Sequence, residues 1–134
     1  MRSLAKRLIA YESRGGKAGQ GEAPAGFVAC EKLHAQLATL MGKGGVRALM
    51  ARALALAAAE VAWLRTVEVR PDGAFGGVER AKIDPQEWNE GGVVLLAQLL
   101  GLLVAFIGEN LTLRLAREIW PKLGRTGLDN TTGE

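Results

Sequence analysis

VVLLAQLLGLLVAFI, residues 93–107, decides the fold. Gln98 is its one polar residue, so nearly all of its side chains must be withdrawn from water. As a helix the stretch would span about 22 Å, against about 30 Å for the hydrocarbon core of a bilayer. The sequence then continues as LTLRLAREIW, in which one helical line stays apolar while the opposite line carries charge. The apolar line is formed by Leu111, Leu115 and Ile119. We therefore expect a helix of a soluble core, fully buried in its first half and surface-lying in its second, rather than a membrane span.

The start and the end of this helix are marked in the sequence. Asp84 can accept hydrogen bonds from the first turn, Pro85 suits the first helical position, and Glu87 sits where a capping-box acid belongs. The proline after Trp120 ends the helix, since the residue before a proline avoids helical geometry. We predict one long central helix from about Pro85 to Trp120, with a kink or break near Gly108 as an alternative.

Small residues recur every four positions inside the apolar stretch, at Ala97, Gly101 and Ala105. A glycine in a helix costs about 1 kcal/mol relative to alanine, but the flat surface lets another backbone come close. We predict a close-packing seam along this line. The neighbouring backbone belongs either to the same chain or to a second copy, and Trp120 is placed in the same candidate interface.

Helical periodicity divides the first half of the chain into three helices. Residues 3–13 form a short basic amphipathic helix, and a glycine-rich flexible linker follows it up to Gly26. Apolar side chains at helical spacing predict further helices at about 27–41 and 46–64, the second of them smooth with alanine. Because only the segment GKGG at 42–45 connects these two helices, they should form an antiparallel hairpin.

The pattern changes after these helices. Val67 and Val69 alternate with polar residues, and Pro71-Asp72-Gly73 suits a type I turn. We predict a short β-hairpin that returns through Phe75 and serves as a connector, with presentation of Phe75 to a partner as the alternative. The predicted fold class is all-α: a helical bundle of about four main helices with a long central helix and a possible short β-hairpin connector. We expect the chain to divide into a basic N-terminal arm and linker (1–26), a single bundle domain (27–123) and a disordered tail (124–134).

Charge is concentrated at the N-terminus. The 134-residue chain has a formal net charge of +3, but residues 1–20 alone carry +4, because five Lys or Arg residues there face one acidic residue, Glu12. The rest of the chain therefore sums to −1, which argues against a nucleic-acid-binding domain with a basic folded face. Cys30 is the single cysteine, so no internal disulfide forms, and its place on an apolar helical line predicts a buried thiol. We expect a cytoplasmic protein with no cofactor, and the Ala/Leu/Gly-rich composition is typical of many small bacterial helical proteins.

Four polar residues are the candidate ligand-binding residues: Glu31, His34, Glu60 and Gln98. The last three lie on apolar helical lines or within the apolar stretch. If the bundle brings His34, Glu60 and Gln98 together, they form a buried polar cluster. Such a cluster serves either as a ligand or acid–base site or as a hydrogen-bonded group that sets helix register. Glu31 and His34 also form one E-x-x-H half-motif of a carboxylate metal site, but such a site needs two of these motifs and further carboxylates. The chain has one histidine, so a second motif would have to come from a second copy in a dimer, with Glu60 or Glu109 as further ligands. We assign no metal site to the chain.

The sequence offers little support for catalysis. No G-x-S-x-G element is present, and GKGG lacks the spacing and the Lys-Ser/Thr pair of a phosphate-binding loop. Enzymatic activity is therefore left open, with the balance of the sequence against it.

Three hypotheses for function follow. The first is a non-enzymatic interaction or regulatory protein that self-associates through helix surfaces, most simply as a homodimer. Its candidate anchors are the three tryptophans Trp63, Trp88 and Trp120, which are otherwise core residues. The second is a small-molecule or metal-binding helical protein, either an enzyme or a binding protein, that uses the Glu/His/Gln cluster. The third is binding of an anionic membrane surface or of nucleic acid through the basic residues of segment 1–17.

Overall fold

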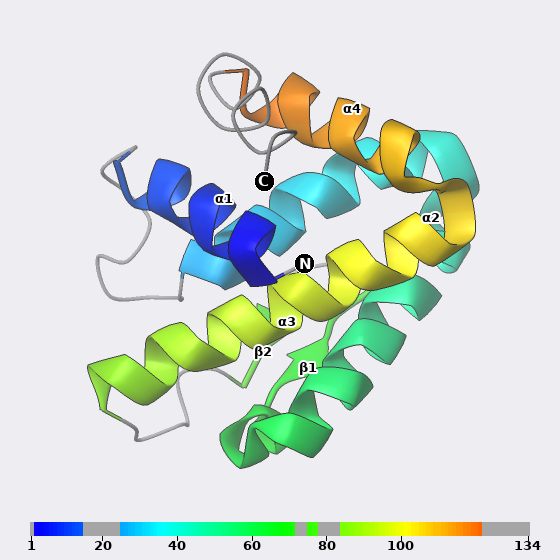
Figure 1. The fold of residues 1–134 in the computed structure, drawn as a ribbon. Helices are drawn as coiled ribbons and strands as arrows, with labels where there is room; N and C mark the ends of the chain where they lie inside the picture. Colours follow the sequence, from blue (N-terminus) through cyan, green and yellow to red (C-terminus); the bar gives the residue numbers. More distant parts are fainter. Residues whose placement is uncertain (1, 15–24, 72–74, 78–83, 122–134) are drawn as a thin grey trace.

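The structure, a computed structural model, describes residues 2–14, 25–71, 75–77 and 84–121. It is an all-α helical bundle with a short two-stranded antiparallel β-hairpin, as the sequence predicts (Figure 1). In chain order the elements are α1 (Arg2–Arg14), α2 (Ala25–Glu60), the 3-10 helix η1 (Ala62–Thr66), β1 (Glu68–Val69), β2 (Phe75–Gly76), α3 (Pro85–Ile107) and α4 (Glu109–Ile119). The tail predicted at 124–134 and most of the predicted linker lie outside the described residues.

Helix α3 lies at the centre of the bundle, and α1, α2 and α4 all pack against it (Figure 1). Its start is fixed as predicted, because the Asp84 carboxylate accepts a hydrogen bond of 2.9 Å from the backbone N–H of Glu87. The helix continues through two glycines into the apolar stretch, whose residues 93–97 are all buried. The prediction that the whole stretch is buried is wrong, because Ala105 and Phe106 near its end are exposed. Withdrawal of this stretch from water, at about 25 cal/mol per Å² of apolar surface, is the main term that holds the helices together.

Two glycines reverse the direction of the chain. Gly108 (φ 91°, ψ 159°) separates α3 from α4, and Gly42 (φ 81°, ψ 159°) interrupts α2. Residues with a Cβ atom essentially avoid this region of backbone conformations, whereas glycine enters it without steric strain. As a result α2 consists of two arms that open as a V from Gly42, and α4 runs back along α2 (Figure 1).

The reversal at Gly108 corrects the prediction of one long central helix. The continuous helix from Pro85 to Trp120 is wrong, because the positive φ of Gly108 ends α3 at Ile107. The alternative of a break near Gly108 is confirmed. The predicted end of the last helix before the proline is also confirmed, since α4 ends at Ile119.

The boundaries around Gly42 also differ from the prediction. The connection predicted at 42–45 is reduced to Gly42 alone, because the backbone from residue 43 onward is helical again. α2 ends at Glu60 rather than at residue 64, and Leu64 lies in η1. The predicted β-hairpin is present, with Val69 paired to Phe75 in antiparallel register.

Helix α1 belongs to the bundle rather than to an arm outside it. Its apolar side faces α2 and α3: Ala5, Leu8 and Ile9 are buried, and Leu4 and Tyr11 are partly buried against the same core. The amphipathic pattern predicted for residues 3–13 is therefore used for packing within the chain. The sequence places the start of the bundle domain at residue 27, but the core also includes this helix.

Candidate functional site

The predicted polar cluster forms in part, and it forms at the surface. Gln98 of α3 donates a hydrogen bond of 2.8 Å from Nε2 to Oε2 of Glu60, the last residue of α2. The other carboxylate oxygen of Glu60 is paired with the guanidinium of Arg2, at the start of α1. The side chains of Arg2 and Glu60 are 55% and 40% exposed, so the cluster joins three helices in contact with water.

These contacts hold Glu60 in its charged form. The hydrogen bond from Gln98 is the largest cause of the lowered pKa of Glu60; Arg2 lowers it further by its hydrogen bond and its charge, and partial desolvation acts in the opposite direction. A carboxyl group with a lowered pKa accepts hydrogen bonds but is a poor proton donor near neutral pH. The arrangement is that of a clamp between helices rather than that of a general acid.

Glu31 and His34 do not join this clamp. Glu31 accepts a hydrogen bond of 3.3 Å at Oε2 from the backbone N–H of Phe75, which ties β2 to the first arm of α2. His34, one turn further along α2, is partly exposed. Within the described ranges, no three His, Cys, Asp or Glu side chains are grouped so that they could hold a metal ion. The structure thus brings Glu60 and Gln98 together and places Glu31 at the hairpin.

Cys30 is fully buried in the first arm of α2. Burial raises the pKa of its thiol far above the ordinary value, and the negative charge of Glu31 raises it further by a smaller amount. The buried apolar role predicted for Cys30 is confirmed. A thiol in this environment does not form the thiolate that a nucleophile or a metal ligand requires.

The predicted small-residue seam runs from the core to the surface. Ala97 is buried, Gly101 is partly exposed and Ala105 is exposed. A Cβ atom placed on Gly101 would have no neighbouring atom within 4 Å, so no backbone of the described chain approaches α3 at this point. Trp120, the fourth candidate interface residue, is buried at the end of α4 and is therefore a core residue.

The close backbone approach lies earlier in α3 than predicted. A Cβ atom on Gly26 would lie 2.4 Å from the carbonyl oxygen of Gly92, so the first turn of α2 crosses α3 with no room for a side chain. A Cβ atom on Gly91 would lie 2.5 Å from the ring of Trp63. The signal in the sequence was the Gly91-Gly92 pair itself, which interrupts a helical pattern directly before the apolar stretch.

The other two tryptophans pack inside the chain as part of an aromatic row. The rings of Trp63 and Trp88 stack with centroids 5.9 Å apart and planes 5° from parallel. The ring centroid of Phe27 lies 6.0 Å from that of Trp63, and the ring centroid of Phe75 lies 4.9 Å from that of Phe27. The indole N–H of Trp63 donates a hydrogen bond of 3.1 Å to the carbonyl oxygen of Glu87. The row joins α2, η1, the hairpin and the start of α3, which favours a packing role for these rings.

The apolar surface that stays open lies on the outer side of the second half of α3. We call it the α3 outer face and define it by four residues at helical spacing on one side: Gly101, Leu102, Ala105 and Phe106. α1 meets α3 near its middle, where the clamp to Gln98 lies, and does not extend along the second half of α3 (Figure 1). Phe106 is 64% exposed, the most exposed large apolar side chain in the described ranges.

Two further exposed leucines lie at the end of the bundle where the chain reverses. Leu40 precedes Gly42 by two residues, and Leu111 follows Gly108 by three residues. The bend of α2 and the junction of α3 with α4 lie at the same end of the molecule (Figure 1). Exposed apolar side chains therefore gather at this end, next to the α3 outer face.

No family model matches this chain, and no match was found among curated proteins or solved structures. The segment Gln86–Ile107 of α3 is long and apolar enough to cross a membrane by length and composition. An 18-residue window within it has a mean hydropathy of 2.1, and 56% of that window is buried inside the bundle. The core helix of a soluble protein passes the same test. The expectation of a soluble core helix stays a prediction.

Proposed function

We propose that this protein is a non-enzymatic helical interaction protein that self-associates through the α3 outer face. The observation that carries the proposal is Phe106, which is 64% exposed on the most apolar helix of the described chain. Together with partly exposed Leu102 it forms a continuous apolar surface in water. Exposed apolar surface of this kind is typical of a contact with another macromolecule.

The small residues beside Phe106 favour a second copy of the chain as the partner. Gly101 and Ala105 form a flat strip one turn long, and a Cβ atom on Gly101 would have nothing within 4 Å. A helix of another protomer can approach such a strip to about 8 Å between helix axes. In a two-fold dimer the same face meets itself, so Phe106 of one protomer lies against the strip of its partner. Each Phe106 withdrawn from water contributes about 1.5–3 kcal/mol.

The polar residues support the non-enzymatic part of the proposal. Glu60 and Gln98 are engaged in the clamp with Arg2, and one oxygen of Glu31 holds the backbone of the hairpin. Each of these groups has a structural partner that accounts for its position. A catalytic role would need a titratable group aimed at an open space with its proton available.

Sedimentation equilibrium of the full chain tests the proposal. Phe106→Glu places a charge from each protomer in the dimer contact, so we expect the molar mass to fall from that of a dimer to the monomer value of 14.2 kDa. The core is not disturbed, because this side chain points into water. Leu56→Glu is the matched control at an exposed apolar residue of α2, and it should leave the molar mass unchanged. A monomeric wild-type chain, or a Phe106→Glu variant that remains dimeric, would contradict the proposal.

A further inference from the structure

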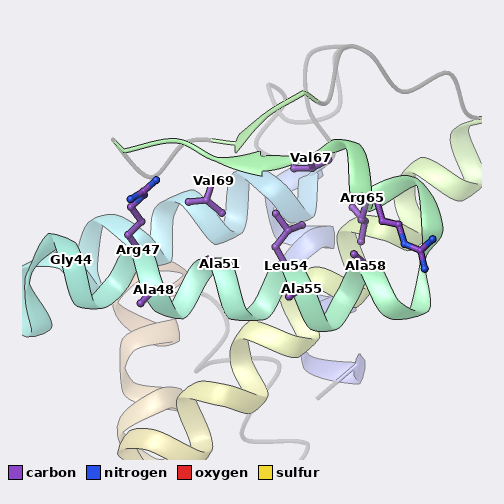
Figure 2. Close-up of a pocket in the computed structure, with 11 residues that line it drawn as sticks. Gly44, Arg47, Ala48, Ala51, Leu54, Ala55, Ala58, Arg65, Val67 and Val69 are labelled. Carbon is purple, nitrogen blue, oxygen red and sulfur yellow. The ribbon is translucent and has the colours of Figure 1, made fainter.

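A groove runs along the second arm of α2, between this helix and the segment formed by η1 and β1 (Figure 2). Its volume is about 600 Å³. Alanines between Ala48 and Ala58 present methyl groups on the α2 side, and Val67 and Val69 form the opposite wall. The groove is therefore apolar along its length, and it lies on elements other than those of the α3 outer face.

The charged groups of the groove are all cationic in the part of the chain that the structure describes. Arg47 and Arg65 are the charged residues in its lining, one near each end (Figure 2). Neither guanidinium has an ion pair or a hydrogen bond among the described residues. Strand alternation turns Glu68 away from the wall that Val67 and Val69 form. Among the described residues, the groove thus offers positive charge without an anionic partner beside an apolar surface, which complements an anionic ligand with an apolar body.

The size of the groove favours a small molecule over a protein partner. Small-molecule sites have volumes of roughly 300–1,000 Å³, and this groove falls within that range. A stable protein interface uses about 20–30 residues on each side and is anchored by large aromatic side chains. In the described part of the chain, 11 residues line this groove, and no tryptophan or tyrosine is among them.

We propose that this groove binds a long-chain carboxylate, with its head group on Arg47 and its alkyl chain along Ala51 and Ala55. The side chain of Arg47 extends from α2 toward the β1 side of the groove, whereas Arg65 points away at the far end (Figure 2). A guanidinium binds a carboxylate through two parallel N–H···O bonds. The alkyl chain leaves water by lying on methyl groups, and the distance from Arg47 to Ala58 along the helix is about 16 Å. This site is independent of the proposed self-association.

Isothermal titration calorimetry of the full chain with dodecanoate, below its micelle-forming concentration, tests the site. We expect saturable binding at one site, and an affinity about tenfold lower in Arg47→Ala because the charged hydrogen-bonded contact is lost. Arg52→Ala is the matched control, since Arg52 is exposed on the same arm but does not line the groove. Dodecyltrimethylammonium, with the same chain length and a positive head group, should not bind.

A second variant tests the path of the alkyl chain. Ala51→Glu puts a carboxylate in the groove, four residues from Arg47, where it repels the ligand and neutralises the guanidinium. Ala59→Glu places the same group on exposed α2 surface outside the groove and should bind dodecanoate as the wild type does. Circular dichroism confirms that each variant is folded. The proposal is overturned if the wild type shows no saturable binding, if the cationic amphiphile binds equally well, or if either Arg47→Ala or Ala51→Glu keeps the wild-type affinity. Binding of an acidic amphipathic peptide in place of dodecanoate would also overturn it.

Discussion

Gly26 and Gly92 meet backbone to backbone where the start of α2 crosses α3. A Cβ atom on Gly26 would lie 2.4 Å from the carbonyl oxygen of Gly92, and the next two nearest atoms also belong to the backbone of Gly92. Backbone atoms inside a helix cannot turn aside as the end of a long side chain can. A single methyl group at this position must therefore push the two helices apart, together with the aromatic row that begins at Phe27.

Gly26→Ala should lower the free energy of unfolding by about 1–3 kcal/mol, as insertion of a methyl group into a closely packed contact does. Gly45→Ala is the matched control on the same helix, because its Cβ atom would lie 3.5 Å from the flexible end of Met41. We expect this control to be neutral or to stabilise the protein by up to about 1 kcal/mol, since alanine favours the helix over glycine. Urea denaturation compares the two variants, and equal stability would show that the crossing is not close.

The clamp at Glu60 predicts a pH dependence. Because the contacts with Gln98 and Arg2 lower the pKa of Glu60 in the folded protein, the clamp stabilises the fold above the ordinary glutamate value of 4.5, and the contribution is lost as the pH falls through the lowered pKa. Glu60→Gln should therefore have a lower Tm than the wild type at pH 7, and the difference should shrink in acid. Thermal melts across the range from pH 7 to acid measure this difference. A Tm difference that stays constant with pH would contradict the assignment.

At the scale of the elements, single glycines decide where the helices end. The residues on either side of Gly108 have helical patterns, and α4 continues an amphipathic pattern directly after the break. Nothing in the described chain lies within 4 Å of a Cβ atom on Gly108, so space alone would allow a side chain there. The backbone conformation is what requires glycine, since a residue with a Cβ atom is strained at φ 91°.

Gly108→Ala should lower the free energy of unfolding by about 1–3 kcal/mol, because alanine must adopt a backbone conformation that is essentially restricted to glycine. Gly44→Ala, at an exposed helical position with open space around it, has no such strain and should be neutral or stabilising. Chemical denaturation followed by circular dichroism compares them. If Gly108→Ala is as stable as Gly44→Ala, then α3 and α4 do not turn back at this residue.

At the scale of the whole molecule, the bundle is one core that includes α1. Leu8 of α1 is fully buried, and α1 packs against both α2 and α3. The clamp among Arg2, Glu60 and Gln98 joins the same three helices at the surface. Removal of α1 would uncover the middle of α3, where α1 packs, and would expose part of the apolar stretch.

Leu8→Ala should lower the free energy of unfolding by about 2–5 kcal/mol, as truncation of a buried leucine does. Lys6→Ala changes an exposed residue of the same helix and should have little effect. Helix content from circular dichroism and tryptophan fluorescence, to which the Trp63–Trp88 stack contributes, should report one shared transition. If Leu8→Ala leaves that transition unchanged, α1 is not part of the cooperative core.

The candidate site was less predictable than the helices. Periodicity placed Glu60 and Gln98 on apolar lines, and they do meet, but the position of Arg2 on the packed α1 makes their contact a surface clamp. The spacing of Gly101 and Ala105 indicated a close-packing seam. That this side of α3 stays uncovered depends on the length of α1 and on the point where α1 crosses α3, and neither can be predicted from the spacing. Distances between residues far apart in sequence depend on crossing geometry, which local periodicity does not contain.

The sequence by itself determined the all-α class, the capped start of α3 at Asp84, the burial of residues 93–97 and the short hairpin, because each depends on neighbouring residues and on the need to withdraw apolar side chains from water. The tertiary structure decided that α3 and α4 separate at Gly108 and that two glycines form the closest crossing. It also decided which apolar residues stay exposed. A glycine is compatible with a helix, a break or a close contact, and only the packing of the other helices selects among them.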